Sequence, residues 1–260
     1  MNNKFKLIIF ILSTINLFSA LGQITPQGQN GKLVANAAVQ VEQKIGKRFT
    51  SITTVAYSRR SQLNNTNVLQ TLGFTGLLQD FSYRINKKWS VSQGQFYGRF
   101  GFDDPQHPTY LNEARLYPRL SYKTEWKGIA LTFQFRTDFR FFYPPPGQTW
   151  NNPFEFRNRL LGRASIPIDK SKKVFFVVIT ELFALTDKDY KSVENGSGHY
   201  YYTPYKFHED RTSFFVRYKF NENLFGDVGV LNQIWRVADG KLTINHQFSI
   251  DLVIVNPFSM

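Results

Sequence analysis

Charged side chains recur at every second position in several stretches of this chain, and most of them are arginines. In the segment 128–143, Arg136, Asp138 and Arg140 alternate with apolar residues, and neighbouring segments repeat the spacing. The whole set is Glu113, Arg115, Arg119, Arg136, Asp138, Arg140, Glu155, Arg157, Arg159, Arg163, Arg211 and Arg217. Guanidinium groups bind carboxylates and other oxyanions. The set therefore predicts either an internal salt-bridged network or a path that favours anionic solutes.

The residue types that catalysis or metal binding requires are scattered. His107, His199, His208 and His246 lack the spacing of zinc ligands, and the chain has no cysteine. There is no G-x-S-x-G nucleophile elbow. The run 195–199 (Asn-Gly-Ser-Gly-His) is a loop sequence. The sequence thus predicts no catalytic residue, no metal site and no cofactor.

Two histidine positions keep an enzymatic alternative open. His246 has the parity of the apolar residues around it, so we expect it to point outward and to face Gln233. An outward histidine suits a lipid-modifying site, and it equally suits a polar residue at a membrane interface. The run His208-Glu209-Asp210 is comparable with the acid–histidine pair of a surface protease, but no second acidic cluster accompanies it.

The alternating charges need β-strands to position them. In 128–143 the apolar residues occupy one parity and the polar residues the other, which is the pattern of a strand with two unlike faces. The apolar face comprises Leu131, Phe133, Phe135, Phe139 and Phe141. Strands of this length and patterning predict a transmembrane antiparallel β-barrel of all-β class with about 10–12 strands. A soluble secreted sandwich built from the same strands is the alternative.

Eleven segments share this pattern and no linker divides them, so residues 23–260 are expected to form a single barrel domain. The segments are 32–45, 48–60, 67–85, 89–102, 109–125, 129–143, 153–168, 173–187, 205–220, 224–238 and 241–255. Tight turns alternate with longer links between them, as short periplasmic turns and longer external loops do in outer-membrane barrels. Because bacterial barrels normally have even strand numbers, 10 or 12 strands are favoured over 11.

Two hairpins are specific enough to predict their register. A two-residue Lys127-Gly128 turn pairs Trp126 with Ile129, and it sets Arg119 opposite Arg136 and Arg115 opposite Arg140. An Asp239-Gly240 turn pairs Leu231 with Phe248 and Trp235 with Ile244 on the outer face. Like charges directly opposite each other destabilise a sheet. Arg119 and Arg136 therefore need neighbours such as Asp138 or Glu155, or a bound anion.

The N-terminus and the overall charge indicate the compartment and exclude one class of partner. Residues 1–22 have a charged start, an apolar core and a small-residue cleavage site, which predicts a cleaved signal peptide. The net charge of +13 is strong, yet the arginines are spaced singly along strands rather than clustered. This spacing argues against nucleic acid as a partner. It favours a lumen lining or contact with anionic lipopolysaccharide.

The longest predicted loop runs from Thr186 to Pro204 and carries Tyr190, His199 and the run Tyr200-Tyr201-Tyr202. Aromatic residues on an exposed loop predict either a binding surface or girdle residues at a membrane rim. Both interpretations stay open at this point.

The chain resembles an uncharacterised family of bacterial outer-membrane β-barrels, a domain-of-unknown-function family. The similarity rests on 155–160 (Glu-Phe-Arg-Asn-Arg-Leu), 180–183 (Thr-Glu-Leu-Phe), Arg211 after the long loop, and 245–248 (Asn-His-Gln-Phe). It covers essentially the mature chain and implies a barrel, a compartment and no known activity. It also implies that Glu181 and Arg211 pair inside the lumen. The chain departs from many barrels in that Phe258 is followed by two further residues.

Together these features predict a barrel in the bacterial outer membrane that serves as a narrow channel or as a structural or surface protein. Outer-membrane lipid and lipopolysaccharide are the expected partners, with small anionic solutes as candidate cargo. A barrel enzyme acting on lipid or peptide at the outer face is the alternative function.

Overall fold

The computed structural model consists of β-strands, in keeping with the alternating sequence pattern. It describes residues 33–61, 67, 69–101, 109–148, 153–186, 188–192, 198–202, 206–236 and 242–258. Over these residues, no helix has the length and apolar character needed to cross a membrane. The expected signal peptide, residues 1–22, and His107 lie outside the described residues.

Thirteen strands occur within the described residues, and eleven of them match the predicted segments closely. They are β1 (Leu33–Ile45), β2 (Phe49–Arg60), β3 (Thr71–Arg84), β4 (Trp89–Gly101), β5 (Tyr110–Trp126), β6 (Ile129–Tyr143), β7 (Phe154–Pro167), β8 (Val174–Thr186), β9 (Lys188–Ser192), β10 (Gly198–Tyr202), β11 (Lys206–Asn221), β12 (Leu224–Arg236) and β13 (Leu242–Val255). The short strands β9 and β10 form a separate antiparallel hairpin within the long loop, which the sequence analysis missed.

The other eleven strands form one closed barrel in the order β1-β13-β12-β11-β8-β7-β6-β5-β4-β3-β2. The all-β barrel prediction is confirmed, and the sandwich alternative is wrong. The preference for an even strand number is also wrong. The barrel closes because β1 and β13 pair in parallel, from Leu33 beside His246 to Glu42 beside Val255. An odd number of strands puts the first and last strands in the same direction, so a parallel seam is the consequence.

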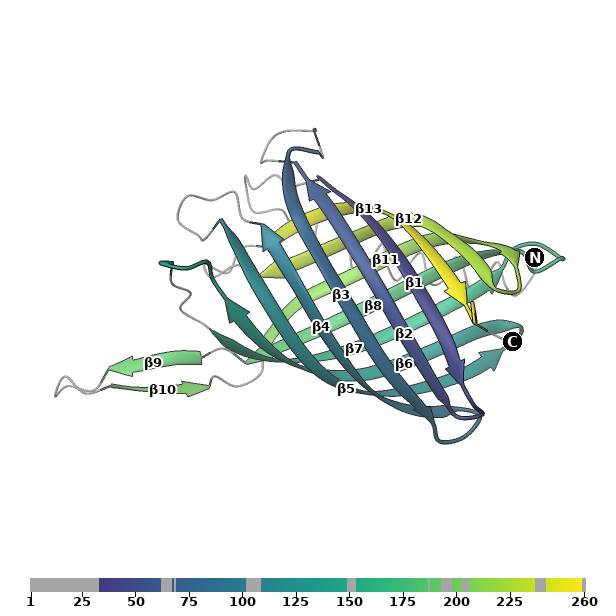
Figure 1. Ribbon diagram of the computed structural model, residues 1–260, viewed down its shortest axis with the longest axis horizontal. Coiled ribbons are helices and arrows are strands. Elements are labelled where there is room, and N and C mark those ends of the chain that lie inside the picture. The colour runs from purple at the N-terminus through teal and green to yellow at the C-terminus, as the bar shows by residue number, and fades with distance from the viewer. Residues whose placement is uncertain are drawn as a thin grey trace.

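The connections sort by length onto the two mouths of the barrel, as predicted (Figure 1). Residues 46–48, 85–88, 127–128, 168–173 and 222–223 join strands at one end, the short-turn mouth. The strand ends that longer stretches of sequence separate, and the β9–β10 hairpin, lie at the other end, the long-loop mouth. Lys127 and Gly128 both have positive φ, of 50° and 78°. Two such residues form the two-residue turn whose twist matches paired strands.

Asp169 closes the longest of the short turns. Its carboxylate accepts hydrogen bonds from the Ser171 hydroxyl, from the backbone N–H of Val174 at 2.8 Å and from that of Lys173 at 3.1 Å. The Ser171 contact first, and then the backbone donors, lower the pKa of Asp169 to about 2. The ionised carboxylate therefore caps this turn at neutral pH.

One predicted register is confirmed and the other is wrong by one residue. In the β5–β6 hairpin Trp126 pairs with Ile129, and Arg119 lies opposite Arg136. In the β12–β13 hairpin Leu231 pairs with Gln247 instead of Phe248. The last pair before this turn joins Arg236 to Leu242, so the connection is longer than the predicted two residues. The one-residue slip turns Leu231 to the inside, because side chains alternate across a strand.

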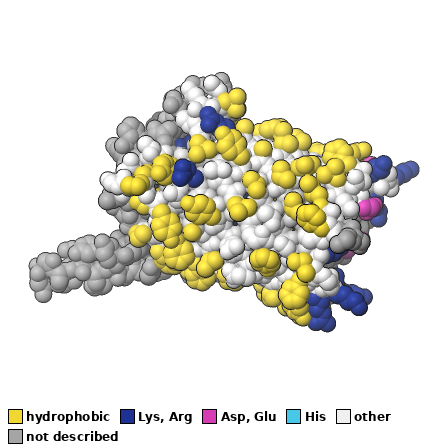
Figure 2. Space-filling view, in the orientation of Figure 1, with side chains coloured by type: hydrophobic (Ala, Val, Ile, Leu, Met, Phe, Trp, Pro, Cys, Tyr) yellow, Lys and Arg dark blue, Asp and Glu magenta, His cyan; other side chains and the backbone are white. Residues whose placement is uncertain are grey.

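Between the two mouths the outer face of the barrel carries many exposed apolar side chains, interspersed with uncharged polar ones such as Thr53, Gln79 and Gln95 (Figure 2). Exposed aliphatic and aromatic side chains include Val55, Leu77, Leu120, Phe135, Leu160, Val216, Val230 and Ile250. Aromatic pairs lie near the short-turn mouth, with ring centroids 5.0 Å apart for Phe49–Tyr83 and 4.8 Å apart for Trp89–Tyr122. Near the long-loop mouth, Phe141 and Phe154 lie 5.1 Å apart. The arginines of β5 to β8 and β11 have the opposite parity and face inward, whereas Asp210 of β11 has the outward parity.

Candidate functional site

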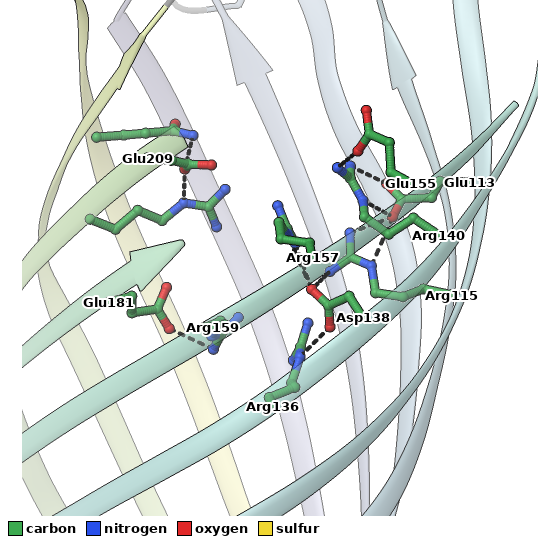
Figure 3. Close-up of polar contacts among 12 residues, drawn as sticks. Glu113, Arg115, Arg136, Asp138, Arg140, Glu155, Arg157, Arg159, Glu181 and Glu209 are labelled. Carbon is green, nitrogen blue, oxygen red and sulfur yellow. Dashed lines mark hydrogen bonds and ion pairs between the residues drawn. The ribbon is translucent and has the colours of Figure 1, made fainter. Parts of the chain in front are cut away.

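The predicted charged residues converge on one side of the barrel interior, where five neighbouring strands supply them (Figure 3). Glu113, Arg115 and Arg119 come from β5, and Arg136, Asp138 and Arg140 from β6. Further members are Glu155, Arg157 and Arg159 from β7, Glu181 from β8 and Arg211 from β11. We call this set, together with Glu209 and without Arg119, the arginine network. Alternation along each strand is what points all of these side chains the same way.

Glu113 is the first acidic centre of the arginine network and is fully buried. Its carboxylate accepts hydrogen bonds from Arg140 Nε at 2.7 Å and Nη2 at 3.0 Å, and from Arg115 Nε at 2.8 Å. Arg140 also contacts Glu155. Arg115 and Arg140 are register partners on β5 and β6. Glu113 therefore offsets the repulsion between two arginines that the sheet holds opposite each other.

Asp138 is the second acidic centre and is also fully buried. One oxygen accepts from Arg136 Nε at 2.5 Å, and the other from Arg157 Nη2 at 2.8 Å and Nε at 3.1 Å. Arg115 Nη1 lies 3.7 Å away, which links the two acidic centres. The expectation that Arg136 needs Asp138 as a neighbour is confirmed. Charge-assisted hydrogen bonds of this kind are about twice as strong as neutral ones.

Arg119 finds a partner that the sequence analysis did not name. Its Nη2 donates to Asp80 on β3 at 2.8 Å, and its Nε donates to the Ser92 hydroxyl at 3.0 Å. Asp80 is almost completely buried, and its second oxygen has no hydrogen-bond partner within the described part of the chain. The sequence feature that indicates an inward Asp80 is its position in 71–84, where it has the same parity as Leu78 and Ser82.

On β8 and β11 the ion pairs differ from the expected Glu181–Arg211 pair. Glu181 and Arg211 are register partners across these strands. The ion pairs, however, join Glu181 to Arg159 at 2.5 Å and Arg211 to Glu209. Glu209 also accepts a hydrogen bond from Gln233 of β12. The direct Glu181–Arg211 pair is therefore not formed.

Aromatic rings support the guanidinium groups from the side. The Arg136 guanidinium carbon lies 3.9 Å from the centroid of the Tyr117 ring, and that of Arg115 lies 4.8 Å from the Phe96 ring. The Phe183 ring has Arg157 and Arg211 at 4.7 Å and 4.8 Å. Cation–π contacts hold the planar groups in fixed orientations. Contacts within the protein thus organise the network.

Tyr117 packs against the backbone of the next strand. A Cβ built on Gly94 would lie 2.0 Å from the Tyr117 ring, so the ring occupies the space that a side chain at 94 would need. Glycine is therefore required at this position for the close approach. The Tyr117 hydroxyl is buried and has no hydrogen-bond partner among the residues that the structure describes.

An internal chamber of about 800 Å³ lies beside the arginine network. Seven arginines line it, and among its lining residues Asp251 is the one carboxylate. The seven are Arg60, Arg115, Arg136, Arg140, Arg157, Arg159 and Arg211. The acidic partners Glu113, Asp138 and Glu209 are buried behind the guanidinium groups and do not line the chamber. The chamber wall on this side is therefore guanidinium.

The opposite wall of the chamber combines short side chains with the aromatic rings of Phe74, Phe96 and Phe100, and it includes Arg60 of β2. Ala38 from β1, Ser58 from β2 and Gly73 and Gly76 from β3 line it, with Gln247 and Ser249 from β13. Asn36 donates a hydrogen bond to Gln247 at 2.8 Å across the parallel seam. A chamber therefore remains beside these glycines and short side chains, although the arginine network fills the other side.

A second, smaller charged group lies inside the barrel on β7, β11, β12 and β13. Arg217 and Asp227 form a two-point ion pair, with distances of 2.6 Å and 2.5 Å. Asp251 lies opposite Asp227 in the register and accepts a hydrogen bond from Ser249 at 3.0 Å. Arg163 has the same inward parity. The sequence analysis placed Arg163 and Arg217 inside and missed both aspartates.

The histidine sites show less organisation. His246 is exposed on the outer face, and its Nδ1 lies 2.7 Å from Asn232 Oδ1. Its register partners are Asn232 and Leu33, not the expected Gln233, and neither supplies a nucleophile. The side chains of His199 and His208 lie outside the described residues, as do those of Tyr190 and Tyr200-Tyr201-Tyr202. Within the described parts of the chain, no group of three potential ligands is placed to hold a metal ion.

Comparison with known proteins supports the resemblance noted from the sequence. The family model described as Protein of unknown function (DUF2490) matches residues 37–243, which span β1 to the start of β13. A comparison with curated proteins found no match. The matched region contains every member of the arginine network. The chain therefore belongs to the DUF2490 family of proteins of unknown function.

Proposed function

We propose that this protein is an outer-membrane β-barrel that binds small anionic solutes in its arginine-lined chamber and lets them pass between the two mouths. The membrane location is supported by the many exposed apolar side chains of the outer face and by the aromatic pairs near both ends of the barrel. Aromatic rings with polar tips favour membrane–water interfaces, and apolar side chains favour the hydrocarbon between them.

A cell-level experiment tests this location. Full-length protein with its N-terminal segment is expected in the outer-membrane fraction, and the purified barrel is expected to show heat-dependent gel mobility. Closed barrels resist unfolding by detergent at room temperature because every strand is paired. A protein that stays monomeric and soluble without detergent would contradict the proposal.

The solute class rests on one observation, namely that the arginines face the chamber while their carboxylate partners are buried behind them. An anion in the chamber meets guanidinium groups directly, and the compensating negative charges are farther away. Planar guanidinium groups bind carboxylate and phosphate oxygens in pairs. The buried acids keep the arginines in place without competing for that surface.

The geometry also favours an open chamber over a purely structural plug. A network that only stiffened the barrel would fill the interior from wall to wall. Here the network occupies the β5–β8 and β11 side, and a chamber of about 800 Å³ remains between it and a facing wall of glycine, alanine, serine and phenylalanine residues. Filling is the usual outcome in small barrels, so this asymmetry is informative.

The enzymatic alternative receives no comparable support. On the outer face, His246 contacts Asn232, and its register partners are Asn232 and Leu33, neither of which is a serine or threonine. Nucleophilic catalysis needs the base within hydrogen-bond reach of the nucleophile. Our proposal is therefore a binding and transport role without covalent chemistry.

Conductance in planar bilayers under a KCl gradient tests the proposed path. Arg211 is the most accessible member of the network, with 28% of its side chain exposed, so we choose Arg211→Gln as the variant. Removing one charge about 5 Å from an anion path weakens anion binding by about 1 kcal/mol in nearly aqueous surroundings. The chloride-to-potassium permeability ratio should therefore fall roughly fivefold.

Two further variants make the test specific. Arg211→Lys keeps the charge and should keep the anion preference, and Lys87→Gln removes an exposed charge from a short turn and should leave selectivity unchanged. Heat-dependent gel mobility checks that each variant is folded. A wild-type protein without conductance, or a selectivity that Arg211→Gln does not alter, would refute the transport proposal.

A further inference from the structure

A groove on the outer face of the barrel lies near the long-loop mouth and has a volume of about 360 Å³. Its apolar part is formed by Val55, Leu77 and Tyr97, which are register neighbours on β2, β3 and β4 and are each about half exposed. These side chains have the outward parity, so the groove is separate from the internal chamber. The apolar part of its lining suits a hydrocarbon chain.

The end of this groove nearest the long-loop mouth is polar. Arg99, two residues from the end of β4, and Asn112 of β5 complete the lining. Arg99 Nε donates to Asn112 Oδ1 at 2.9 Å, and the guanidinium carbon lies 4.1 Å from the centroid of the Tyr110 ring. These two contacts orient the guanidinium group and use one of its five donors. The remaining donors are available to a ligand.

The positive charge of Arg99 is not compensated within the described residues. The ion pairs found there, with N···O distances up to 4.0 Å, involve neither Arg99 nor Arg59. Arg59 lies at the same rim on β2, and its Nε donates to the neutral backbone carbonyl of Leu69 at 3.2 Å. Dark-blue basic side chains are visible at this end of the face in Figure 2. Every arginine of the internal network, by contrast, has a carboxylate partner.

We infer that this groove is a binding site for one lipid molecule with a phosphate headgroup, taken from the membrane leaflet at the long-loop mouth. The acyl chain lies along Val55, Leu77 and Tyr97, and the phosphate accepts hydrogen bonds from Arg99, with Arg59 as a second nearby cation. The apolar part of the groove lies toward the middle of the barrel and the arginine lies at the rim. The acyl chain and the phosphate of a membrane lipid are arranged in the same sequence. Charge-assisted hydrogen bonds from arginine to phosphate supply the specificity.

This inference rests on the proposed membrane location and not on transport through the chamber. The purified barrel in neutral detergent is titrated with phosphatidic acid and, separately, with diacylglycerol of the same acyl chains, and bound lipid is counted by native mass spectrometry. Phosphatidic acid should bind with a stoichiometry of one and at least about tenfold more tightly than diacylglycerol, because only the former engages Arg99. Equal binding of the two lipids would overturn the inference.

Variants assign the site to the groove. Arg99→Gln should reduce phosphatidic acid affinity about tenfold and leave diacylglycerol binding unchanged, whereas Lys87→Gln at the other mouth should change neither. Thr75→Phe, which fills the groove beside Leu77, should weaken both lipids. Inorganic phosphate at the same concentration should not displace the lipid, because it lacks the acyl contact. Displacement by phosphate, or wild-type affinity in Arg99→Gln, would contradict the proposed site.

A chamber variant separates this inference from the transport proposal. Arg211→Gln should alter ion selectivity and leave lipid binding intact. Arg99→Gln should weaken phosphatidic acid binding and leave ion selectivity intact. Loss of phosphatidic acid binding in Arg211→Gln would place the lipid phosphate in the chamber and refute the groove. Absence of conductance in all proteins would refute transport and leave the lipid result unaffected.

Discussion

Replacing Asp138 with asparagine is the sharpest test of whether the arginine network holds the barrel together. The carboxylate is fully buried and accepts hydrogen bonds from Arg136 and Arg157, which are only 5% and 4% exposed. Asparagine keeps the shape and removes the charge, so two buried guanidinium groups lose the same partner. A third, that of Arg115, lies 3.7 Å from the carboxylate.

The expected magnitude follows from these contacts. Removing one member of a buried ion pair costs about 3–5 kcal/mol, because the remaining charge is left without compensation. Since Asp138 serves two arginines at once, we expect Asp138→Asn to lower the free energy of unfolding by an amount at the upper end of this range, about 5 kcal/mol. The midpoint of urea unfolding in detergent or lipid vesicles should shift accordingly.

A matched control makes the result interpretable. Glu222→Gln removes a carboxylate that is 88% exposed and bonds Lys219 at 2.6 Å, and it should cost less than about 0.5 kcal/mol. The double variant Asp138→Asn with Arg136→Met removes one of the stranded charges and should recover part of the loss. If the free energies of unfolding of Asp138→Asn and Glu222→Gln differ by less than about 1 kcal/mol, then the buried Asp138 carboxylate does not stabilise the barrel as we argue.

Two further predictions test packing and topology. Gly94→Ala should destabilise the barrel by about 3 kcal/mol in the same unfolding assay, because its Cβ would overlap the Tyr117 ring, whereas Gly162→Ala meets nothing within 4 Å and should change little. Equal stability of the two variants would contradict the tight Tyr117 contact. In this cysteine-free chain, Ala37→Cys with Ile250→Cys should cross-link across the parallel seam, and Ala37→Cys with Val230→Cys, two strands away, should not. Failure to cross-link under oxidising conditions would argue against an eleven-stranded closure.

Alternation along the chain was sufficient to predict the barrel and most of the charged interior. In 110–143 both strands alternate cleanly and the turn has two residues, so parity and turn length together define the register. In 224–255 both faces of β12 carry apolar residues, and the connection between β12 and β13 is longer than the predicted two residues. Matching apolar residues of the two strands therefore predicts a register that differs by one residue from the one in the structure.

Partner choice and closure could not be obtained in the same way. Parity shows that Arg119 and Asp80 point inward, but they lie 39 positions apart in the sequence, on strands separated by β4. Their contact depends on side-chain reach across the curved interior. Glu181 meets Arg159 instead of its register partner Arg211 for the same reason. The parallel β1–β13 seam has no local signal, because either orientation of the closing pair satisfies the alternating pattern.

The parallel seam has a consequence for engineering the chain. In a barrel with an even strand number the first and last strands run in opposite directions, so the two ends meet at one rim and a short peptide can join them. Here Leu33 lies beside His246, and Val255 lies beside Glu42 further along β1. A linker for circular permutation must therefore cover about 30 Å of strand, at about 3.3 Å per residue. Short linkers tolerated by other barrels should fail here, and reporter tags fused next to Leu33 and to Val255 should report from opposite mouths.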